Sequence, residues 1–288
     1  MTSLGAVFTP FNPPERLRSV ARAADAAGLE QLWLWEDCFR EGGVSNMAAA
    51  LAWTENLRVG VGVFPVPLRN VALTAMEASS LSRMFGDRAI IGIGHGVVNW
   101  MDQVGAKAAS PLTLLREYTT ALRTLLRGER VTVAGKYVKL DDVALDWPPL
   151  RVPPIHAAAT GPKTLRLVGE VADGTILTGG TRPDEVRKAV ALINEGRTVA
   201  GRTDAHEITV YLPVATGPNA AERLRAQEEY FGETDLFSVA GDAGAIADMV
   251  TEFAEAGATS VILQPTADET DPESFVRFVT EKIRPLVD

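Results

Sequence analysis

The chain has 288 residues, of which 46% are hydrophobic, and it carries a formal net charge of −9 with a single cysteine, Cys38. An acidic balance without a long run of Lys or Arg argues against a nucleic-acid-binding protein. One cysteine excludes an internal disulfide framework, and no apolar run has the length of a membrane span, so we expect a cytoplasmic protein with no membrane association.

Apolar segments of strand length alternate with amphipathic segments of helical period along the whole chain. We expect strands at 4–8, 31–35, 58–63, 89–93, 155–158, 175–178, 207–214 and 259–263. We expect helices near 14–27, 45–53, 71–85, 112–126, 162–171, 183–200, 220–230 and 243–256. Apolar strands are typical of a parallel sheet covered on both faces.

Eight strand–helix units predict an α/β chain that folds as a single (β/α)₈ barrel, a TIM barrel, in one domain over residues 1–288. An open doubly wound sheet is the competing architecture. The first strand is followed by FTPFNPPE, which lacks the glycine-rich dinucleotide fingerprint of that fold.

Two insertions interrupt the pattern. After the fourth strand, residues 129–153 alternate apolar and polar side chains around Ala134-Gly135, which predicts a hairpin followed by a proline-rich return. After the seventh strand, residues 231–240 are expected to form a loop that leads to an extra helix.

The segment ATGPKTLRLVGEVADGTILTGG, residues 159–180, opens a helix with a Gly-Pro step. Pro162 fits a first helical turn because its missing N–H is not needed there. The backbone donors around Thr160, Gly161, Lys163 and Thr164 would point out of the helix start, with the positive end of the helix dipole behind them. This arrangement predicts a phosphate site, and an ordinary helix start without a ligand is the alternative.

In a TIM barrel the chemistry gathers at the carboxyl ends of the strands. The residues expected there are mostly apolar or aromatic, with Glu36, Asp37 and His95 as the titratable groups. Such a surface suits a flat aromatic cofactor. The three histidines lack a ligand spacing and Cys38 has no evident histidine base, so we expect neither a catalytic metal nor a cysteine nucleophile.

His95 lies between Gly94 and Gly96 just after the fourth strand, which makes it a candidate general acid or base. The alternative for His95 is a cap on a loop carbonyl. Glu36 and Asp37 could supply an acid or accept a hydrogen bond from a cofactor hydroxyl, and the alternative for both is a solvated turn or the cap of the next segment.

Five pieces of the chain carry a family resemblance: PPERLRSVARAADAAGLEQLWLWED, VGVGVFPVPLRN, GIGHGV, GPKTLRLVGEVADG and VAGDAGAIADMVTEFAEAGATSVIL. Over nearly its whole length the chain resembles the luciferase-like monooxygenase superfamily. Within it, the chain is similar to the branch that uses the deazaflavin coenzyme F₄₂₀, which includes methylenetetrahydromethanopterin reductases and F₄₂₀-dependent glucose-6-phosphate dehydrogenases.

The resemblance implies an oxidoreductase that transfers a hydride between F₄₂₀ and a small organic substrate, and it implies a homodimer. It places Asp37 at the cofactor head group and residues 160–164 at the phosphate. It also implies a non-proline cis peptide behind the ring, at Val61–Gly62 or Gly62–Val63. The residues that it assigns to the cofactor are Asp37, Val61, Gly62, Phe64, His95, Gly96, Trp100, Thr160, Gly161, Pro162, Lys163, Thr164, Thr178, Gly179 and Arg182.

The chain departs from the sugar-phosphate dehydrogenases at three positions. Cys38 and Val97 stand where those enzymes have a catalytic histidine and a catalytic glutamate, and Trp100 replaces a polar cofactor contact. The chain is therefore not expected to be that dehydrogenase, and His95, Glu36 and Asp37 are the catalytic candidates. An FMN-dependent monooxygenase of the same superfamily and a barrel that binds a cofactor without turnover are the alternatives.

Overall fold

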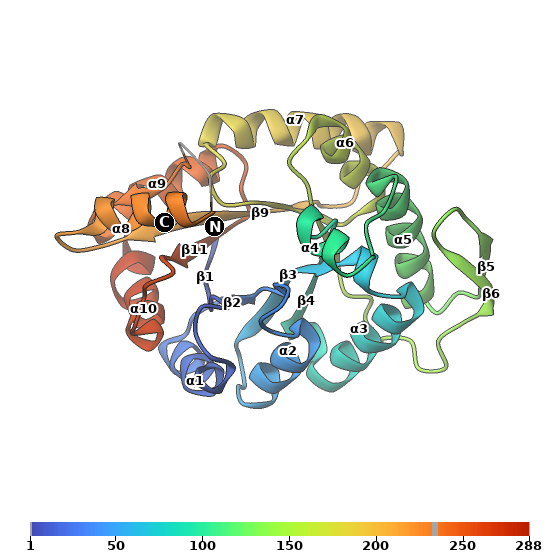
Figure 1. Cartoon of the computed structure of the whole chain (residues 1–288), viewed down its shortest axis with the longest axis horizontal. Helices are drawn as coiled ribbons and strands as arrows, with labels where there is room; N and C mark the ends of the chain where they lie inside the picture. Colours follow the sequence, from blue (N-terminus) through green and yellow to red (C-terminus); the bar gives the residue numbers. More distant parts are fainter. Residues whose placement is uncertain (1, 232–235, 288) are drawn as a thin grey trace.

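The computed structural model describes residues 2–231 and 236–287, and its strands form a closed parallel barrel (Figure 1). The barrel strands, in the order in which they pair, are β1 (Ser3–Val7), β2 (Gln31–Leu34), β3 (Arg58–Pro65), β4 (Ala89–Gly94), β7 (Ile155–Ala158), β8 (Gly174–Leu177), β9 (Glu207–Ala215) and β11 (Ser260–Pro265). Parallel pairing of β8 with β9 and of β11 with β1 closes the ring. The predicted (β/α)₈ barrel is confirmed.

The helices surround the strands, as Figure 1 shows. They are α1 (Leu17–Ala27), α2 (Gly43–Ala52), α3 (Val71–Phe85), α4 (Val98–Gln103), α5 (Pro111–Leu126), α6 (Pro162–Val171), α7 (Pro183–Val199), α8 (Ala220–Phe231), α9 (Ala243–Glu255) and α10 (Pro272–Phe278). Short turns of 3₁₀ helix span Pro14–Arg16, Val66–Leu68, Gly86–Arg88 and Arg284–Leu286, and a π-helical turn spans Val279–Ile283. The sequence pattern did not predict α4 and α10, because six or seven residues are too few to show a helical period.

The first insertion contains the expected hairpin. Strands β5 (Val131–Ala134) and β6 (Lys139–Val143) pair antiparallel and project from the edge of the molecule beside α5 (Figure 1). The carboxylate of Glu117 on α5 accepts hydrogen bonds from the backbone N–H groups of residues 136–138, which ties the hairpin turn to the barrel. The hairpin is therefore separate from the carboxyl ends of the barrel strands.

The second insertion differs from its prediction. Residues 232–235 of the expected loop lie outside the described residues, but β10 (Val239–Ala240) is a strand that pairs with the end of β9. The reason is that β8 pairs with β9 only as far as Val210, so the same edge of β9 has unpaired backbone groups at Val214 and Ala215. The two helices α8 and α9 follow β9, as expected.

Trp33 fills the interior of the barrel, where it is completely buried among Val7, Ile90, Ile176, Tyr211 and Ile262. Two glycines of β3 make room for it. A Cβ atom at Gly60 would lie 2.6 Å from the indole ring, and one at Gly62 would lie 3.0 Å from it. Because a strand alternates its side chains, the intervening residue of β3 faces the helices instead.

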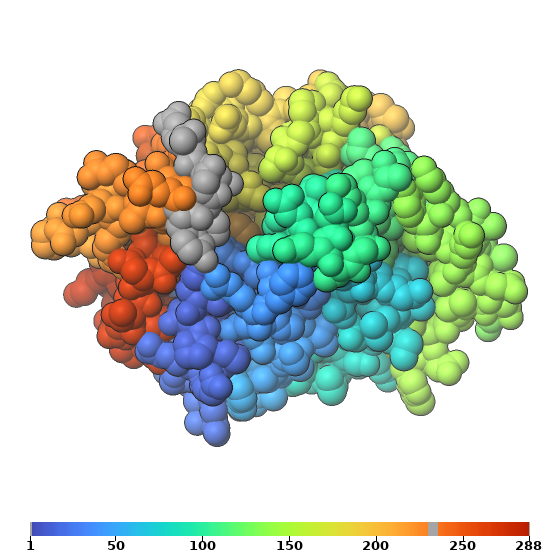
Figure 2. Space-filling model, viewed as in Figure 1, coloured from blue at the N-terminus to red at the C-terminus, as the bar shows by residue number. Residues whose placement is uncertain are grey.

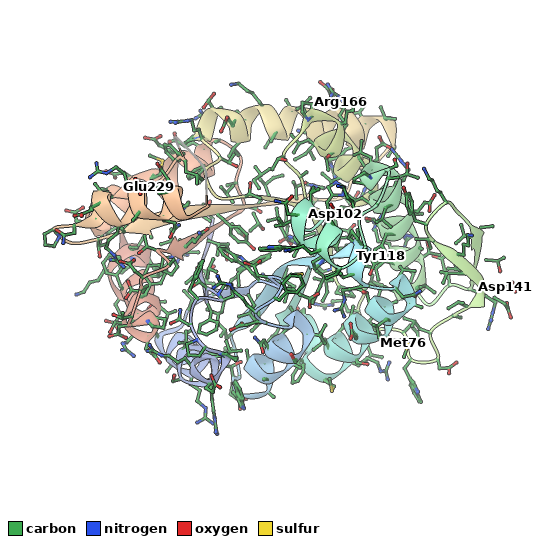
Figure 3. The ribbon with its side chains drawn as sticks, in the orientation of Figure 1. Met76, Asp102, Tyr118, Asp141, Arg166 and Glu229 are labelled. Carbon is green, nitrogen blue, oxygen red and sulfur yellow. The ribbon has the colours of Figure 1, made fainter. Side chains whose placement is uncertain are left out.

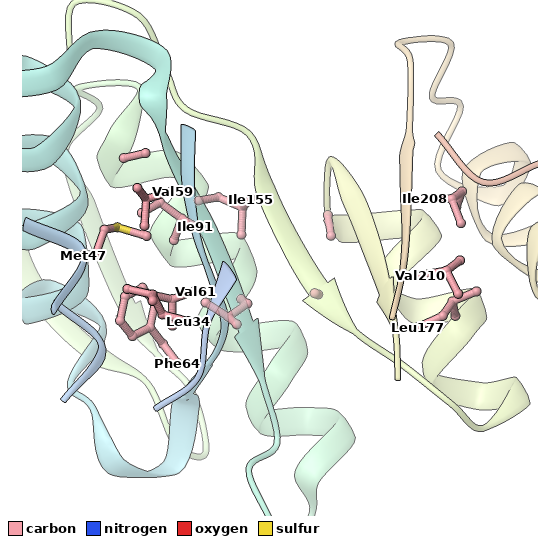
Figure 4. Packing of buried hydrophobic residues seen from close by; sticks show 14 of the residues in the cluster. Leu34, Met47, Val59, Val61, Phe64, Ile91, Ile155, Leu177, Ile208 and Val210 are labelled. Atoms are coloured by element: carbon pink, nitrogen blue, oxygen red, sulfur yellow. The ribbon is translucent and has the colours of Figure 1, made fainter. Parts of the chain in front are cut away.

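The second part of the core lies between the barrel and the helices. Figure 4 shows Val59 and Val61 of β3 in the same layer as Met47 of α2 and Phe64, all of them buried. On the other side of the barrel, Ile208 and Val210 of β9 extend this layer (Figure 4). The outward residues of the strands therefore pack against helices on every side, as the apolar strand sequences predicted.

Helices α6 and α7 pack with their backbones in contact. A Cβ atom at Gly169 would lie 2.1 Å from the carbonyl oxygen of Ile193, and a Cβ atom at Gly196 would lie 1.9 Å from that of Arg166. Only glycine permits this approach. The contact fixes the two helices relative to each other, and residues of both helices line a cavity of the site described below.

Candidate active site at the barrel mouth

Four of the predicted site residues lie at the carboxyl ends of neighbouring barrel strands. Glu36 follows β2, Phe64 lies near the end of β3, His95 follows β4 and Thr160 follows β7. Since these strands are parallel and adjacent, the four residues share one rim of the barrel. The prediction that they lie on the same face is confirmed, and we refer to this face as the barrel mouth.

A cavity of about 730 Å³ opens beside this rim, between the start of α6, the end of β8 and the start of α7. Figure 2 shows a hollow in the middle of the face that carries α4. The lining residues are Ala159, Thr160, Pro162, Leu165, Leu177, Thr178, Gly179, Gly180, Thr181, Glu185, Lys188, Ala189, Leu192 and Leu236. Four residues of the predicted phosphate segment are thus brought together, namely Thr160, Pro162, Thr178 and Gly179.

The start of α6 has the geometry of an anion site. Gly161 is the N-cap residue in an extended conformation and provides no side-chain cap, and Pro162 occupies the first turn. A Cβ atom at Gly161 would meet nothing within 4 Å, so open space lies next to the helix start. Lys163 is exposed and Thr164 is half-buried in the same turn. Backbone N–H groups and the helix dipole favour a phosphate here.

The start of α7 is different, because carboxylates of its own first turn occupy it. Glu185 accepts a hydrogen bond of 2.8 Å from the backbone N–H of Arg182, and Asp184 pairs with Lys188 at 2.7 Å. The guanidinium of Arg182 lies 5.3 Å from the centre of the Phe237 ring. Of the two helix starts at the cavity, α6 is therefore the one prepared for an anion.

The expected non-proline cis peptide is present in β3 at Gly62–Val63, the second of the two predicted placements. Val63 packs against the inner side of the barrel together with Trp35, and both are half-buried. Val61 and Phe64 are instead buried in the layer between β3 and the helices. The side chains of Val61 and Phe64, which were assigned to the cofactor, thus face the outer layer of the core. Although they are three residues apart, both face outward because the register of β3 against β4 shifts between them. A second non-proline cis peptide, Cys38–Phe39, was not expected.

Glu36 has the capping role that the sequence left open. Its Oε2 accepts a hydrogen bond of 2.7 Å from the backbone N–H of Gly43, the first residue of α2. Nη1 of Arg69 lies 3.3 Å from both carboxylate oxygens, and the same guanidinium pairs with Glu77 and lies over the ring of Phe64. Glu36 therefore joins the end of β2 to α2 and α3.

Asp37 and His95 differ from Glu36 because they are buried with few partners that would offset the cost of burying a charge. Burial raises the pKa of Asp37 to about 6, although the charge of Arg40 opposes the shift. Burial lowers the pKa of His95, and its Nδ1 is buried without a hydrogen-bond partner among the described residues. At neutral pH the imidazole is neutral and can accept a proton or donate a hydrogen bond.

The loop that carries His95 lies close against the end of β3. Gly96 has a φ of +68°, and a Cβ atom there would lie 2.9 Å from Cβ of Pro65. Trp100 follows on α4 and is half-buried. The structure thus brings the predicted residues His95, Gly96 and Trp100 together beside the rim, at the side of β4.

Neither a metal nor a thiolate is favoured at the mouth. In residues 2–231 and 236–287, no group of three or more His, Cys, Asp or Glu side chains is arranged to hold a metal ion. Burial raises the pKa of Cys38, and the charges of Glu36 and Asp37 raise it further, which disfavours the nucleophilic thiolate. The other two histidines lie at the opposite end of the barrel, His156 within β7 and His206 just before β9.

Sequence reasoning missed two residues at the mouth, Tyr211 and Glu41. The hydroxyl of Tyr211 is 3.5 Å from the carbonyl oxygen of Gly62, and burial raises its pKa. The alternation of β9 could have placed this tyrosine inside the barrel. Glu41 follows Asp37 by four residues, and the acidic spacing in WEDCFREGG is the sequence signal that points to it.

No helix among the described residues is both long and apolar enough to cross a lipid bilayer. The closed barrel and the cavity at the carboxyl ends of its strands define a TIM-barrel protein with its site in the usual enzyme position. The family model for luciferase-like monooxygenases matches residues 2–269, so the chain belongs to the luciferase-like monooxygenase family.

One similar protein is the 5,10-methylenetetrahydromethanopterin reductase of Methanolobus tindarius, which is 33% identical over 208 residues. This match covers 72% of the chain and 63% of the reductase, so the chain matches less than two thirds of that relative's length.

Two solved structures share the fold over the whole chain. The F₄₂₀-dependent tetrahydromethanopterin reductase of Methanopyrus kandleri superposes with a TM-score of 0.84 at 22% identity, covering 100% of this chain and 99% of the reductase. An F₄₂₀-dependent secondary alcohol dehydrogenase, in complex with an F₄₂₀–acetone adduct, has a TM-score of 0.86 at 19% identity and the same coverage.

Proposed function

We propose that the protein is an oxidoreductase that transfers a hydride between coenzyme F₄₂₀ and a small organic substrate. The observation that carries the proposal is the uncapped start of α6 beside a 730 Å³ cavity that adjoins the half-buried, largely apolar rim. When bound, F₄₂₀ supplies a deazaflavin ring that accepts or gives a hydride. The names of the similar reductases and of the alcohol dehydrogenase support the same cofactor.

The residues present fit a cofactor with a phosphate and a flat ring. The open space at Gly161 leaves the N–H groups of the first turn of α6 accessible to a phosphate, with Thr160 and Thr178 lining the same cavity. Val63 and Trp35 would support the ring from the inner side of the barrel. Asp37 would contact the head group. Arg182, whose guanidinium lies over Phe237, would contribute less than the sequence suggested.

His95 is the proposed partner for the proton that accompanies the hydride. Its Nδ1 has no hydrogen-bond partner among the described residues, and its lowered pKa makes it a neutral imidazole at pH 7, suited to accept a proton from a substrate hydroxyl when the substrate is oxidised. The apolar rim would exclude water from the reacting carbon. Glu36 would act through structure alone, since its carboxylate is held by Gly43 and Arg69.

Titration with F₄₂₀ and, separately, with FMN tests the proposal through ring absorbance and fluorescence. We expect saturable binding of F₄₂₀ and much weaker binding of FMN. A graded series, Gly161→Ala and Gly161→Val, should weaken F₄₂₀ binding progressively, because each added carbon occupies the open space at the helix start. Neither change should lower the melting temperature by more than a few degrees.

Tighter binding of FMN would favour the monooxygenase alternative. Binding of F₄₂₀ without turnover of any carbonyl, hydroxyl or unsaturated compound would favour the non-catalytic alternative. Failure of both cofactors to bind would overturn the proposal.

We also propose an isologous homodimer that pairs through α3. Leu73, Met76 and Met84 are 46%, 58% and 62% exposed on this helix, and Figure 3 labels Met76 at its outer side. The proline-rich return packs beside them through the carbonyl of Trp147, which accepts from Ser79, and Trp147 is itself 72% exposed. Exposed apolar side chains gathered on one helix in this way are typical of an interface.

Light scattering on a sizing column tests this assembly. Met76→Glu should give monomers, whereas Val199→Glu, at a more exposed apolar position on α7, should leave the dimer intact. A monomeric parent protein would contradict the dimer. We also propose a cytoplasmic location, which the lone cysteine supports. A single domain over residues 1–288 with an insertion at 129–153 is proposed as well, and the hairpin supports the insertion.

A further inference from the structure

Among the described residues, three glutamines are buried, and two of them have hydrogen-bond partners inside the protein. The carboxamide of Gln31 donates to two serine hydroxyls and accepts from the indole N–H of Trp33. Oε1 of Gln227 on α8 accepts a hydrogen bond of 2.8 Å from the backbone N–H of Ala267. The third, Gln264, is 8% exposed, and neither atom of its carboxamide has a hydrogen-bond partner in the described part of the chain.

Gln264 lies in the barrel mouth. It is the last residue but one of β11 and comes two residues after Ile262, which packs with Trp33 inside the barrel. Because a strand alternates its side chains, Gln264 also faces the interior, one layer nearer to the carboxyl ends of the strands. Its neighbour on β9 is Pro213, whose ring offers no hydrogen bond.

The carboxamide of Gln264 reaches towards the cavity beside the start of α6. A Cβ atom at Gly179, just after β8, would lie 3.2 Å from Oε1 of Gln264 and 3.3 Å from the ring of Pro213. Gly179 lines the 730 Å³ cavity together with Thr160 and Thr178. The carboxamide atoms are not among the fully buried polar atoms, so they keep contact with the open mouth. The side chain therefore presents its polar end to the space in which we expect a ligand.

A carboxamide in this position selects a ligand by the pattern of its hydrogen bonds. It offers a donor and an acceptor side by side, whichever way the amide is turned. Leaving both groups unpaired in a largely buried place is unfavourable, and a ligand that pairs with both relieves it. An imide, –CO–NH–CO–, has an N–H next to a C=O, so it can make two antiparallel hydrogen bonds to a carboxamide. The deazaflavin ring ends in such an imide.

We propose that Gln264 binds the imide edge of the deazaflavin ring and thereby fixes the orientation of the ring in the mouth. This inference rests on the proposed function. The start of α6 holds the phosphate, Val63 and Trp35 support the face of the ring, and Gln264 binds its edge beside Gly179. Gln264 takes no part in proton transfer, and its effect on the reaction comes through the position of the ring.

The first test follows the carboxamide itself. The chain has four glutamines, so ¹⁵N labelling of glutamine gives four side-chain amide signals, and the Gln264→Leu variant identifies one of them. On saturation with F₄₂₀, we expect the amide protons of Gln264 to move downfield and to exchange more slowly with water, because they enter a hydrogen bond to the ring. An unchanged Gln264 signal in the saturated protein would overturn the proposal.

The second test asks whether Gln264 binds the imide edge. Gln264→Leu should raise the F₄₂₀ dissociation constant about tenfold, and an F₄₂₀ derivative methylated at the imide nitrogen should bind the parent protein about tenfold more weakly than F₄₂₀. Gln264→Ala, which also leaves room for the methyl group, should bind the two compounds about equally. Equal discrimination by the parent protein and by Gln264→Ala would overturn the proposal.

Gln227→Leu is the matched control, because Gln227 is as buried as Gln264 but has its partner inside the protein. It should leave the F₄₂₀ dissociation constant within twofold and lower the melting temperature, since the N–H of Ala267 loses its acceptor. Gln264→Leu should do the reverse and weaken binding without lowering the melting temperature. A fall in melting temperature as large as that of the control would reveal a partner within the protein and would overturn the proposal.

The outcomes separate this inference from the proposed function. If F₄₂₀ does not bind the parent protein, the proposed function fails, and this inference fails with it. If F₄₂₀ binds the parent protein and Gln264→Leu with the same affinity, only this inference fails.

Discussion

Asp173 at the amino end of the barrel and Glu41 at the mouth are held in opposite ways, although His156, His206 and Arg197 at the amino end also have buried nitrogens without a hydrogen-bond partner among the described residues. At the amino end, the carboxylate of Asp173 accepts hydrogen bonds from Arg123 at 2.6 Å, from Arg202 at 2.8 Å and from the backbone N–H of Ile155 at 3.1 Å. At the mouth, Glu41 and His95 each leave a buried polar atom without a partner among the described residues. The first arrangement ties helices and strands together, and the second leaves groups available for chemistry.

The difference teaches where stability and function lie in this chain. Ion pairs at the amino end connect α5, β7, β8 and the loop after α7, so they resist separation of these elements. At the mouth, Asp37 has a raised pKa and His95 a lowered one, and such shifts are typical of functional groups. Substitutions at the two ends should therefore separate into effects on rate and effects on unfolding.

The largest effect is expected for His95→Ala. If His95 manages the proton in substrate oxidation, kcat in that direction should fall by about 10²–10⁴, while the F₄₂₀ dissociation constant stays within a few fold. Steady-state kinetics and a fluorescence titration measure the two quantities. Turnover at the parent rate would show that Asp37, Glu41 or water performs this step.

Gly196→Ala tests the contact that positions the cavity from outside the mouth. The added Cβ would lie 1.9 Å from the carbonyl oxygen of Arg166, so α6 and α7 must separate, at a cost of about 3 kcal/mol in the free energy of unfolding. F₄₂₀ binding should weaken as well, because both helices line the cavity. Urea denaturation measures the first effect.

The control for this change is Gly244→Ala, at a helical glycine of α9 whose Cβ would have an ordinary contact of 3.4 Å. It should be neutral or slightly stabilising. If Gly196→Ala unfolds at the parent urea concentration, the tight packing of α6 on α7 does not hold in solution.

Asp173→Asn should lower the free energy of unfolding by about 2 kcal/mol, because Arg123 and Arg202 lose a charged acceptor while remaining mostly buried. Rates and F₄₂₀ binding should be unchanged, which would sharpen the contrast between the two ends. Asp141→Asn is the control, since Asp141 is exposed on the hairpin (Figure 3). A loss of activity without a loss of stability would break the comparison.

The last effect is a pH dependence of stability at the amino end of the barrel. Burial, with the charges of Arg197 and Arg202, lowers the pKa of His206 from 6.5 to about 4, so the unfolded chain binds the proton more readily. His206 therefore contributes its full stability above pH 6.5 and loses it as the pH falls toward 4, by at most about 1.4 kcal/mol per pH unit.

His206→Gln should flatten this slope, because an amide does not titrate in this pH range. The substitution is conservative, since the amide can still bond to the hydroxyl of Thr175, which lies 2.8 Å from Nε2. Urea denaturation at several pH values measures the slope. An identical slope in the variant would assign the acid sensitivity to another group, such as the buried His156.

Much of the fold was predictable because each strand and helix of a parallel barrel has a pattern of apolar residues and helix-start residues within its own short segment of sequence. Strands such as Ile155–Ala158 are apolar runs, and helices such as α6 begin with a Gly-Pro step, so their positions agree with the structure to within about two residues. The pairing of β10 with β9 was not predictable, because two residues have no period and their partner edge exists only once β8 has ended.

The site was predicted as a location more than as a set of contacts. Thr160, Pro162, Thr178 and Gly179 line one cavity because strand ends and helix starts alternate at the same rim. The directions of the Arg182 and Phe64 side chains were not predictable, since they depend on the neighbouring Phe237 and on the outer layer of the core.

The sequence by itself determined the barrel, the rim and the helix start that can hold a phosphate, because each depends on short periods and on capping residues close together in the chain. Only the tertiary structure decided which carboxyl groups have hydrogen-bond partners and which do not. Glu36 pairs with Arg69, 33 positions away in the sequence. Glu41 instead has a carboxylate oxygen without a hydrogen-bond partner in the described part of the chain. The physical reason is that desolvation and ion pairing depend on every element packed around a group, and no local pattern records them.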